Sequence, residues 1–311
     1  MRHLPLLLLA LATLAACSPR RHGPAATAER LDSLFAWRYG SNSSQAPGCA
    51  VLISRPDSTI YEHYQGVADL CTQEPIDSAT RFCIASVSKQ FTVAALLQQA
   101  ALGRVSLADT VARFYPEYTR PFWNTITLAD LAGHTSGLPD ARDRSDRDAC
   151  VHATDSSSIL FFADVDSLRF APGTAYDYQN PTFLLLAGVV EKCSGTDFIS
   201  YAAANLFGKA GMRSTYYFSP DSAPAHQAHA YAPDDLGARW HEFDYGEETF
   251  FATRPDGGIY STARDMARWQ HALAKGRIVP DSLLARARTP RIDVASSPWC
   301  DYQQRPHTWY V

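Results

Sequence analysis

The sequence of 311 residues lacks several features that would point to particular classes of protein. It has no C-x-x-C pair, which argues against a zinc knuckle or a thioredoxin-type redox centre. It has no long run of lysine and arginine, and its formal net charge is −4, so the charge pattern gives no reason to propose nucleic acid as a partner. With 46% hydrophobic and 19% charged residues, the chain can bury a full-sized core, as one large domain or two closely packed ones.

An uncharged apolar stretch, residues 4–16, opens the chain and is too short to cross a bilayer as a stable helix. It is typical of an export signal, and its end, Leu14-Ala15-Ala16-Cys17, resembles the lipobox of bacterial lipoproteins. We therefore expect a signal peptide over residues 1–16, lipidation of Cys17 and a polar tether up to residue 27. An ordinary cleaved signal is the alternative. Lipidation implies an anchor on the periplasmic side of the cell envelope, with the outer membrane preferred because Ser18 follows the cysteine.

The cysteines agree with export. If Cys17 carries lipid, six remain, and these allow 15 full pairings. An oxidising compartment permits disulfides, although small buried hydrophobic cysteines are an equally good interpretation of any given pair. The seven cysteines are Cys17, Cys49, Cys71, Cys83, Cys150, Cys193 and Cys300.

Hydrophobic periodicity predicts early strands and later helices. Asn180 is expected to cap a helix that has Pro181 at its first position, whereas residues 139–158 are charged and resemble an exposed irregular insertion. Early strands followed by many helices indicate an α+β fold or mixed α/β layers. The expected strands are residues 49–54, 59–66 and 81–85, and the expected helices are residues 28–39, 86–102, 127–132, 181–195 and 262–276.

Ser86 and Lys89 form an S-x-x-K pair at the start of a helix that is apolar on nearly every face. At this spacing the two side chains lie on one face of the helix, within reach of each other. Desolvation lowers the pKa of a buried lysine and makes its neutral amine available as a base, which a serine hydroxyl needs to become a nucleophile. The Ser86 amide could also contribute to an oxyanion hole. Taken alone the pair is common by chance, and a serine N-cap beside a solvent-reaching lysine explains it equally well.

Four segments in a fixed order give this pair its context. They are residues 81–92 (RFCIASVSKQFT), 126–139 (ITLADLAGHTSGLP), 172–180 (PGTAYDYQN) and 257–265 (GGIYSTARD). Together they resemble the superfamily of class C β-lactamases, D-alanyl-D-alanine carboxypeptidases and related esterases, the penicillin-recognising serine hydrolases. The resemblance extends from about residue 28 to about residue 275, and four ordered matches are far more specific than one.

The resemblance implies a β-lactamase/transpeptidase-like fold, with an antiparallel sheet flanked by helices and a mostly helical lobe. It implies that Ser86 is the nucleophile and that Tyr178, in the Y-x-N element, shares proton transfer between Ser86 and the leaving group. Lys89 would either hold Tyr178 as a phenolate or act as the base itself, and both assignments stay open. Asn180 would bond to Lys89 and to the substrate amide, in addition to capping a helix. A packed aromatic is the alternative role for Tyr178.

Other candidate motifs are weaker. Ser145-Asp146-Arg147 resembles S-D-N but lies in a charged run, and Lys209-Ala210-Gly211 resembles K-T-G where a structural turn is expected. His226 and His229 lack the neighbouring glutamate of a metal site, so no metal or other cofactor is expected. His134, in the second segment, is expected to be structural rather than catalytic.

The third element of the family, K-T-G or H-x-G, has no match after Gly276. From this we expect that the sequence is C-terminally truncated and that the last strands of the sheet are missing from the domain over residues 28–311. The expected reaction is acyl transfer through an acyl-enzyme, on a D-Ala-D-Ala peptide, a β-lactam or a small ester. The expected partners are this small-molecule or peptidoglycan-peptide substrate and, through the lipid, a membrane. The alternative is a lipid-anchored binding or sensing module that keeps the fold without turnover.

Overall fold

The structure, a computed structural model, describes residues 24–39, 46–55, 58–140, 154–219, 226–234, 239–242 and 253–292. The chain divides into two units, residues 1–42 and 43–311. In the first unit the described residues form helix α1 (Pro24–Tyr39), which confirms the helix expected there but begins before residue 28. The expected signal peptide and Cys17 lie outside the described residues, and within these no helix is long and apolar enough to cross a membrane.

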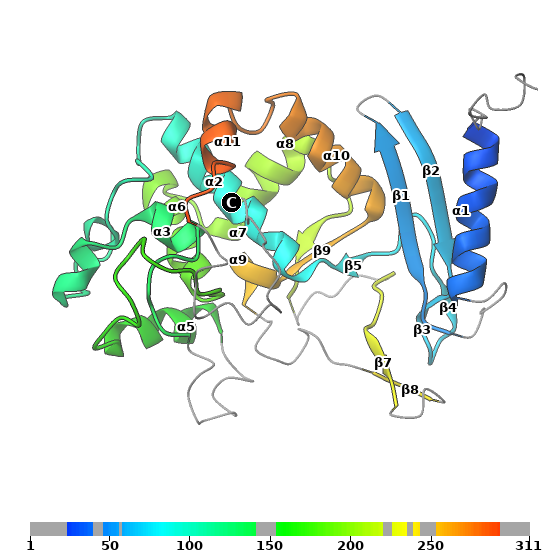
Figure 1. Ribbon diagram of the computed structural model, residues 1–311, viewed down its shortest axis with the longest axis horizontal. Helices are drawn as coiled ribbons and strands as arrows, with labels where there is room; N and C mark the ends of the chain where they lie inside the picture. The colour runs from blue at the N-terminus through cyan, green and yellow to red at the C-terminus, as the bar shows by residue number, and fades with distance from the viewer. Residues whose placement is uncertain are drawn as a thin grey trace, which may run out of the picture. The chain divides into compact units, whose positions relative to one another are not determined.

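The second unit combines short helices with small antiparallel sheets (Figure 1). This confirms the expected mixture of helices and antiparallel strands. The helices are α2 (Lys89–Ala101), α3 (Leu128–Ala132), α5 (Asp155–Phe161), α6 (Thr182–Ser194), α7 (Phe198–Ala202), α8 (Gly208–Ala210), α9 (Arg254–Gly257), α10 (Ala263–Ala274) and α11 (Asp281–Ala287). The strands are β1 (Cys49–Arg55), β2 (Ser58–Gln65), β3 (Val67–Asp69), β4 (Glu74–Pro75), β5 (Phe82–Cys83), β6 (Tyr216–Tyr217), β7 (Tyr231–Pro233), β8 (Trp240–Glu242) and β9 (Ile259–Ser261).

Two of the sheets decide where the later elements lie. Strands β1 and β2 form the expected hairpin, in which Cys49 pairs with Gln65, and α10 packs against β1. A three-stranded sheet has the order β5–β9–β6, so β9 lies between two strands that precede it by many residues in the chain. This order brings the segment after Gly258 beside the segment that leads into Ser86.

Helix α2 lies in the middle of the hydrophobic core, against α6, α7, α9 and α11. Phe91 and Leu96 are completely buried, and the Phe91 ring stacks on Trp269 of α10 with 4.2 Å between the ring centroids. A helix that is apolar on nearly every face can bury its surface only in an interior position, so the sequence of α2 dictates its place. Gly103 follows it with a φ of 70°, a conformation that suits the residue after a helix end.

The structure corrects two local expectations. Residues 139–158 are not wholly irregular, because Thr154 caps α5 by accepting a hydrogen bond from the Ser157 amide. Pro181, not Asn180, directly precedes α6, and the Asn180 side chain makes no capping bond there. The physical reason is that the Asn180 side chain is bonded to Lys89 instead.

The described cysteines in this unit lie in different segments of the chain. Cys49, Cys71 and Cys193 are free thiols, so none of them forms a disulfide, and burial raises the pKa of the Cys49 and Cys193 thiols. The Cys83 thiol donates to the carbonyl of Gly257 at 3.8 Å. Cys150 and Cys300 lie outside the described residues.

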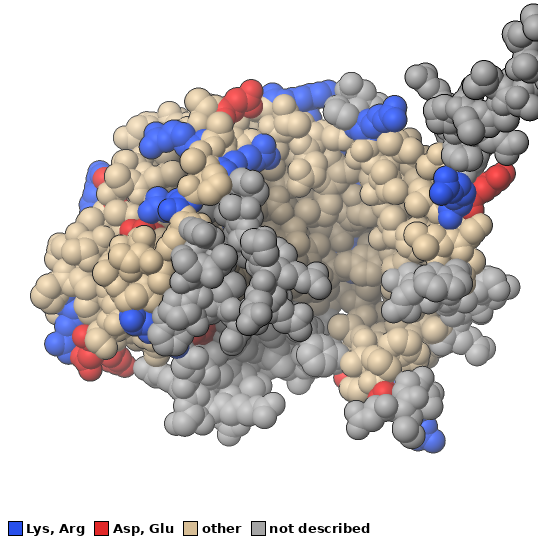
Figure 2. All heavy atoms as spheres, viewed as in Figure 1, with Lys and Arg blue, Asp and Glu red and all other residues tan. Residues whose placement is uncertain are grey.

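Charged side chains are dispersed over the face shown in Figure 2. Lysine and arginine occur there in several separate groups over the helical part, with acidic and uncharged side chains between them. The described residues of this face therefore do not form a continuous stripe of one charge.

Candidate active site

Ser86 lies in a single turn of 3₁₀ helix, Ala85–Ser88, between β5 and α2. The turn begins with Ala85 at a φ of 43°, in the left-handed region that side chains other than glycine rarely adopt. Such local strain persists where the surrounding structure holds it, and functional sites are common places for it. The Ser88 hydroxyl accepts a hydrogen bond from the Ile259 amide at 3.2 Å and ties the turn to β9, whereas Ser86 remains exposed.

Lys89, the first residue of α2, is only 7% exposed and donates three hydrogen bonds. Its Nζ lies 3.1 Å from the Ser86 Oγ, 2.6 Å from the Asn180 Oδ1 and 2.9 Å from the main-chain oxygen of Asp256. An ammonium group has three donors and no acceptor, so these three oxygens match its full capacity. The rings of Tyr178 and Phe183 also face the charge, with centroids 5.0 and 5.3 Å from Nζ.

The Tyr178 hydroxyl completes the polar contacts of Ser86, at 2.6 Å from its Oγ. The Tyr178 ring stacks on the ring of His134 at 4.4 Å and is 37% exposed, so it is packed on one side and open on the other. The preceding residue, Asp177, is held by an ion pair with Arg169 at 2.6 Å and by its own amide, which donates to the carbonyl of His134 at 2.9 Å. These contacts fix the backbone that carries Tyr178.

His134 supports this tyrosine from a half-buried position. Its Nδ1 accepts a hydrogen bond from the Gln179 amide at 3.0 Å. Burial, reinforced by the nearby Lys89 charge, lowers the pKa of His134 to about 3, so the imidazole is neutral at ordinary pH. His134 was expected to be structural, and here it contacts Tyr178 and Gln179 within the site as a neutral ring.

The loop after α3 places His134. Thr127 and Asp130 form a capping box at the start of α3, and the Asp130 Oδ1 accepts from the Thr135 hydroxyl at 3.0 Å. Gly137 has a φ of 74°, and a Cβ there would lie 2.1 Å from the carbonyl oxygen of Phe170. Only glycine allows the loop to approach so closely.

The segment before β9 contributes a main-chain atom that the sequence patterns did not reveal. Asp256, in α9, gives its carbonyl oxygen to Lys89, and Gly258 then allows the chain to turn tightly into β9. A Cβ on Gly258 would lie 2.9 Å from the Cα of Arg254. The motif at residues 257–265 pointed to this part of the chain. It could not predict the acceptor at Asp256, because every residue type has the same main-chain carbonyl oxygen.

The structure thus brings Ser86, Lys89, Tyr178 and Asn180 into one cluster and leaves the other candidates apart. Lys209 and Gly211 belong to the turn that ends α8, with Gly211 at a φ of 76°. His226 contacts Glu74, His229 contacts Glu242, and no group of metal-binding side chains occurs among the described residues. Residues 145–147 and 307–309 lie outside the described residues.

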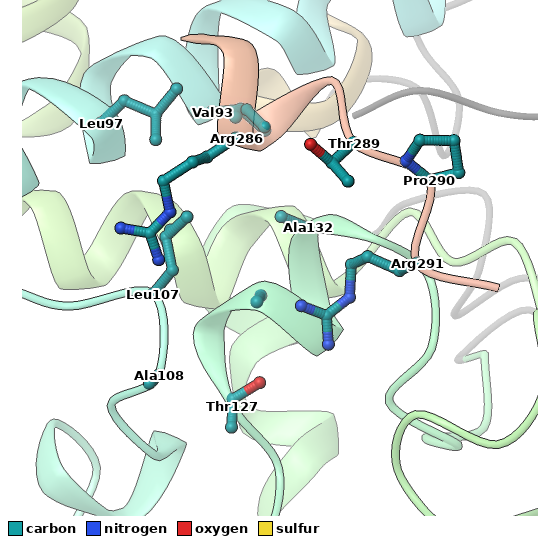
Figure 3. A pocket seen from close by; sticks show the side chains of 12 residues that line it. Val93, Leu97, Leu107, Ala108, Thr127, Ala132, Arg286, Thr289, Pro290 and Arg291 are labelled. Carbon is teal, nitrogen blue, oxygen red and sulfur yellow. The ribbon is translucent and has the colours of Figure 1, made fainter. Parts of the chain in front are cut away.

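A separate cavity of about 520 Å³ lies between α2, α3 and the segment around α11 (Figure 3). Its walls are mainly apolar, with Val93 and Leu97 of α2 on one side. The guanidinium groups of Arg286 and Arg291 extend into it, and Arg291 bonds to the buried Asp130 at 2.8 Å. None of the clustered site residues lines this cavity.

Comparison with known proteins identifies the family. The family model named Beta-lactamase matches residues 26–311. The chain belongs to the β-lactamase family. The D-aminopeptidase of Cereibacter sphaeroides is 28% identical over 261 residues, which cover 83% of this chain and 49% of that protein. A penicillin-binding protein of Bacillus subtilis is 27% identical over 257 residues, which cover 77% of this chain and 55% of that protein.

Solved structures agree with this membership. A penicillin-binding protein from Bacillus halodurans has a TM-score of 0.70 at 28% identity, covering 84% of this chain and 79% of that chain. A penicillin-binding protein homologue from Pyrococcus abyssi has a TM-score of 0.74 at 23% identity, covering 91% and 64%, and shares the fold. The expected β-lactamase-like fold is confirmed. The chain spans about half the length of the curated relatives it matches.

Proposed function

We propose that this member of the β-lactamase family is a serine hydrolase in which Ser86 forms an acyl-enzyme. One observation carries the proposal: the Ser86 hydroxyl is exposed, yet its Oγ lies 3.1 Å from the Lys89 Nζ and 2.6 Å from the Tyr178 hydroxyl. A nucleophile within hydrogen-bond reach of a base, which is itself oriented by a third group, is the arrangement that activates a hydroxyl.

Tyr178 is the base in this proposal, and Lys89 is the cation that stabilises its phenolate. Several contacts favour the ammonium form of Lys89, namely the short bond to Asn180, the carbonyl of Asp256 and the two aromatic faces. An ammonium group has no lone pair with which to take a proton from Ser86. The phenolate oxygen of Tyr178 does, at 2.6 Å.

The reaction then proceeds in two acyl transfers. Ser86 Oγ bonds to the substrate carbonyl carbon while its proton passes to Tyr178, and the carbon–nitrogen or carbon–oxygen bond breaks as Tyr178 returns that proton to the leaving group. Water, losing a proton to Tyr178, then attacks the ester carbon, and the bond from this carbon to the Ser86 Oγ breaks as Tyr178 returns the proton to Ser86. The Asn180 side-chain amide nitrogen is a donor for the substrate, because its oxygen is already engaged by Lys89, and the Ser86 amide is a candidate oxyanion donor.

The preferred substrate class is an amide of a D-amino acid. The support is the names of two relatives, since the Cereibacter sphaeroides protein is a D-aminopeptidase and the Bacillus subtilis protein is a penicillin-binding protein. β-Lactams and small esters share the same acyl-transfer chemistry. Hydrolysis of D-alanine p-nitroanilide, with its L enantiomer, nitrocefin and p-nitrophenyl acetate in parallel, tests the choice. Equal rates on the two enantiomers would contradict the D-specific assignment.

Labelling with a fluorophosphonate probe tests the serine mechanism itself. The full chain should be labelled, Ser86→Ala should not, and Tyr178→Phe should be labelled at least about 100-fold more slowly. Tyr176→Phe is the matched control, because this tyrosine lies two residues away and its ring contacts His134 only by an edge. Labelling that survives Ser86→Ala would refute the nucleophile. An intact protein that never labels would favour the non-catalytic binding or sensing module.

The location is part of the same proposal. The protein is tethered to the bacterial cell envelope through lipid on Cys17, supported by the apolar residues 4–16 and the lipobox-like residues 14–17. Incorporation of an alkyne-bearing fatty acid in cells should be lost in Cys17→Ser. Equal incorporation of the fatty acid in the wild type and the variant would contradict lipidation of Cys17.

A further inference from the structure

Asp256 has a buried side chain in addition to the carbonyl that binds Lys89. Its residue is 2% exposed, and among the described residues no donor lies within hydrogen-bond distance of its Oδ1. The Thr253 side chain bonds to the carboxyl group. A buried carboxyl group with an unmatched oxygen is costly unless a charge of opposite sign lies nearby.

Lys89 supplies that charge. The main-chain oxygen of Asp256 is 2.9 Å from the Lys89 Nζ, and covalent geometry keeps an aspartate carboxyl group within roughly 5 Å of its own carbonyl oxygen. The carboxyl group is therefore within about 8 Å of the ammonium group. Burial raises the pKa of the Asp256 carboxyl, and the Lys89 charge acts in the opposite direction, as expected for two interacting groups.

Apart from the Tyr178 phenolate of the proposed function, the described ionisable groups around this pair carry little unbalanced charge. Asp155 of α5 faces Asp256, but the guanidinium and amide of Arg254 bond to both its oxygens at 2.8 and 2.9 Å. Tyr217 of β6 is buried, and burial raises its pKa, so the phenol is neutral. On the other side of Lys89, His134 is neutral and Tyr178 faces Ser86.

We propose that the Asp256 carboxylate is a positioning residue that holds Lys89 in its ammonium form and thereby sets the alkaline limit of the pH range in which Ser86 is activated. The inference rests on the proposed function, because it assumes that Tyr178 is the base and Lys89 its cation. Asp256 does not touch the reacting atoms. It acts through Lys89, from behind the catalytic cluster.

The sign of the effect follows from electrostatics. A negative charge near Lys89 favours the ammonium form and so raises the pH at which that form is lost. Burial raises the pKa of the Asp256 carboxyl to about 6, so the charge is present on the alkaline limb of the activity profile, and removing it should move that limb to lower pH. For a charge about 8 Å away in a medium of effective dielectric constant about 20, the expected shift is on the order of one pH unit.

The test is the second-order rate of fluorophosphonate labelling of the full chain, measured across pH for the wild type and Asp256→Asn. The asparagine keeps the shape and the main-chain carbonyl but removes the charge. We expect the alkaline midpoint to fall by about one pH unit, with the maximal rate retained within about tenfold. Asp281→Asn, an exposed aspartate of α11, is the control and should leave the profile unchanged.

Two results would overturn the proposal: a lower rate at every pH with an unmoved alkaline midpoint, or movement of the alkaline midpoint to higher pH. If Asp256→Asn does not fold, ¹³C NMR titration of the Asp256 carboxyl in the wild type and in Lys89→Met replaces it. The titration midpoint should rise in Lys89→Met, and an unchanged midpoint would refute the interaction. Ser86→Ala separates the two proposals, because continued labelling of that variant defeats the proposed function whatever Asp256 does.

Discussion

Helix α2 carries two regions of opposite character. At its first residue, Lys89 bonds to three oxygens at 2.6 to 3.1 Å, and each of them comes from a different segment of the chain. One to two turns later, Val93 and Leu97 face a cavity of about 520 Å³ (Figure 3). The first region is a set of polar contacts around one buried cation, whereas the second is a cavity with mainly apolar walls. A substitution should therefore change chemistry at one and only packing at the other.

The largest effect is expected from Lys89→Met. Loss of the cation removes the stabilisation of Tyr178 and leaves the oxygens of Asn180 and Asp256 without their donor, so the rate of fluorophosphonate labelling should fall by at least about 10³-fold. Leu97→Met, at the cavity, is the matched control on the same helix and should keep nearly full activity, with a stability change below about 1.5 kcal/mol. Comparable losses in both variants would erase the contrast between the regions.

The next effect concerns pH and His134. The folded pKa of about 3 lies below the ordinary histidine value, so the unfolded chain binds a proton that the folded chain refuses. The free energy of unfolding should fall as pH decreases from about 7 towards 3, by up to roughly 3 kcal/mol between pH 7 and pH 4. Urea unfolding at a series of pH values measures this. The dependence should flatten in His134→Gln but persist in His241→Gln, an exposed histidine of β8.

Gly258 offers a smaller effect inside the catalytic region. A Cβ there would lie 2.9 Å from the backbone of Arg254, whereas one on Gly257 would meet nothing closer than 4.0 Å. Gly258→Ala should therefore reduce stability by about 1–3 kcal/mol and slow labelling, and Gly257→Ala should do less on both counts. Thermal unfolding and labelling rates of the pair provide the comparison, and the reverse order would contradict the close packing before β9.

The smallest effect is expected at the cavity. Ala132 of α3 lines it, so Ala132→Leu can fill empty space and should change stability by no more than about 1 kcal/mol, with activity unchanged. Ala95 of α2 is fully buried and does not line the cavity, so Ala95→Leu should destabilise by about 1–3 kcal/mol. Equal melting temperatures for the two variants would mean that the cavity does not accept a larger side chain.

The sequence predicted the clustered side chains better than the structure around them. Ser86, Lys89, Tyr178 and Asn180 were expected from ordered motifs because their chemistry restricts the residue types. The acceptor from Asp256 was not, since any residue has a carbonyl group. The helix at Asp155 was missed because charged neighbours obscured the Thr154 cap. The capping role of Asn180 was wrong, whereas its bond to Lys89 had been expected from the resemblance.

Local sequence patterns also could not predict the order of the strands in the sheet. Strand β9 lies between β5 and β6, and periodicity in a three-residue strand cannot identify partners so far away in the chain. Residues 1–16, Cys17 and the C-terminal truncation remain predictions from sequence.

The three partners of Lys89 have a consequence for how the protein becomes active. Ser86 is a local neighbour, but Asn180 and Asp256 lie 91 and 167 residues further along the chain. Contacts between residues so far apart in the sequence form late in folding, because the entropy cost of closing a long loop comes before the contact stabilises the chain. During refolding, helical signal should return before reactivity towards the probe. The nascent chain therefore carries an inert serine until the segment around Asp256 has been made.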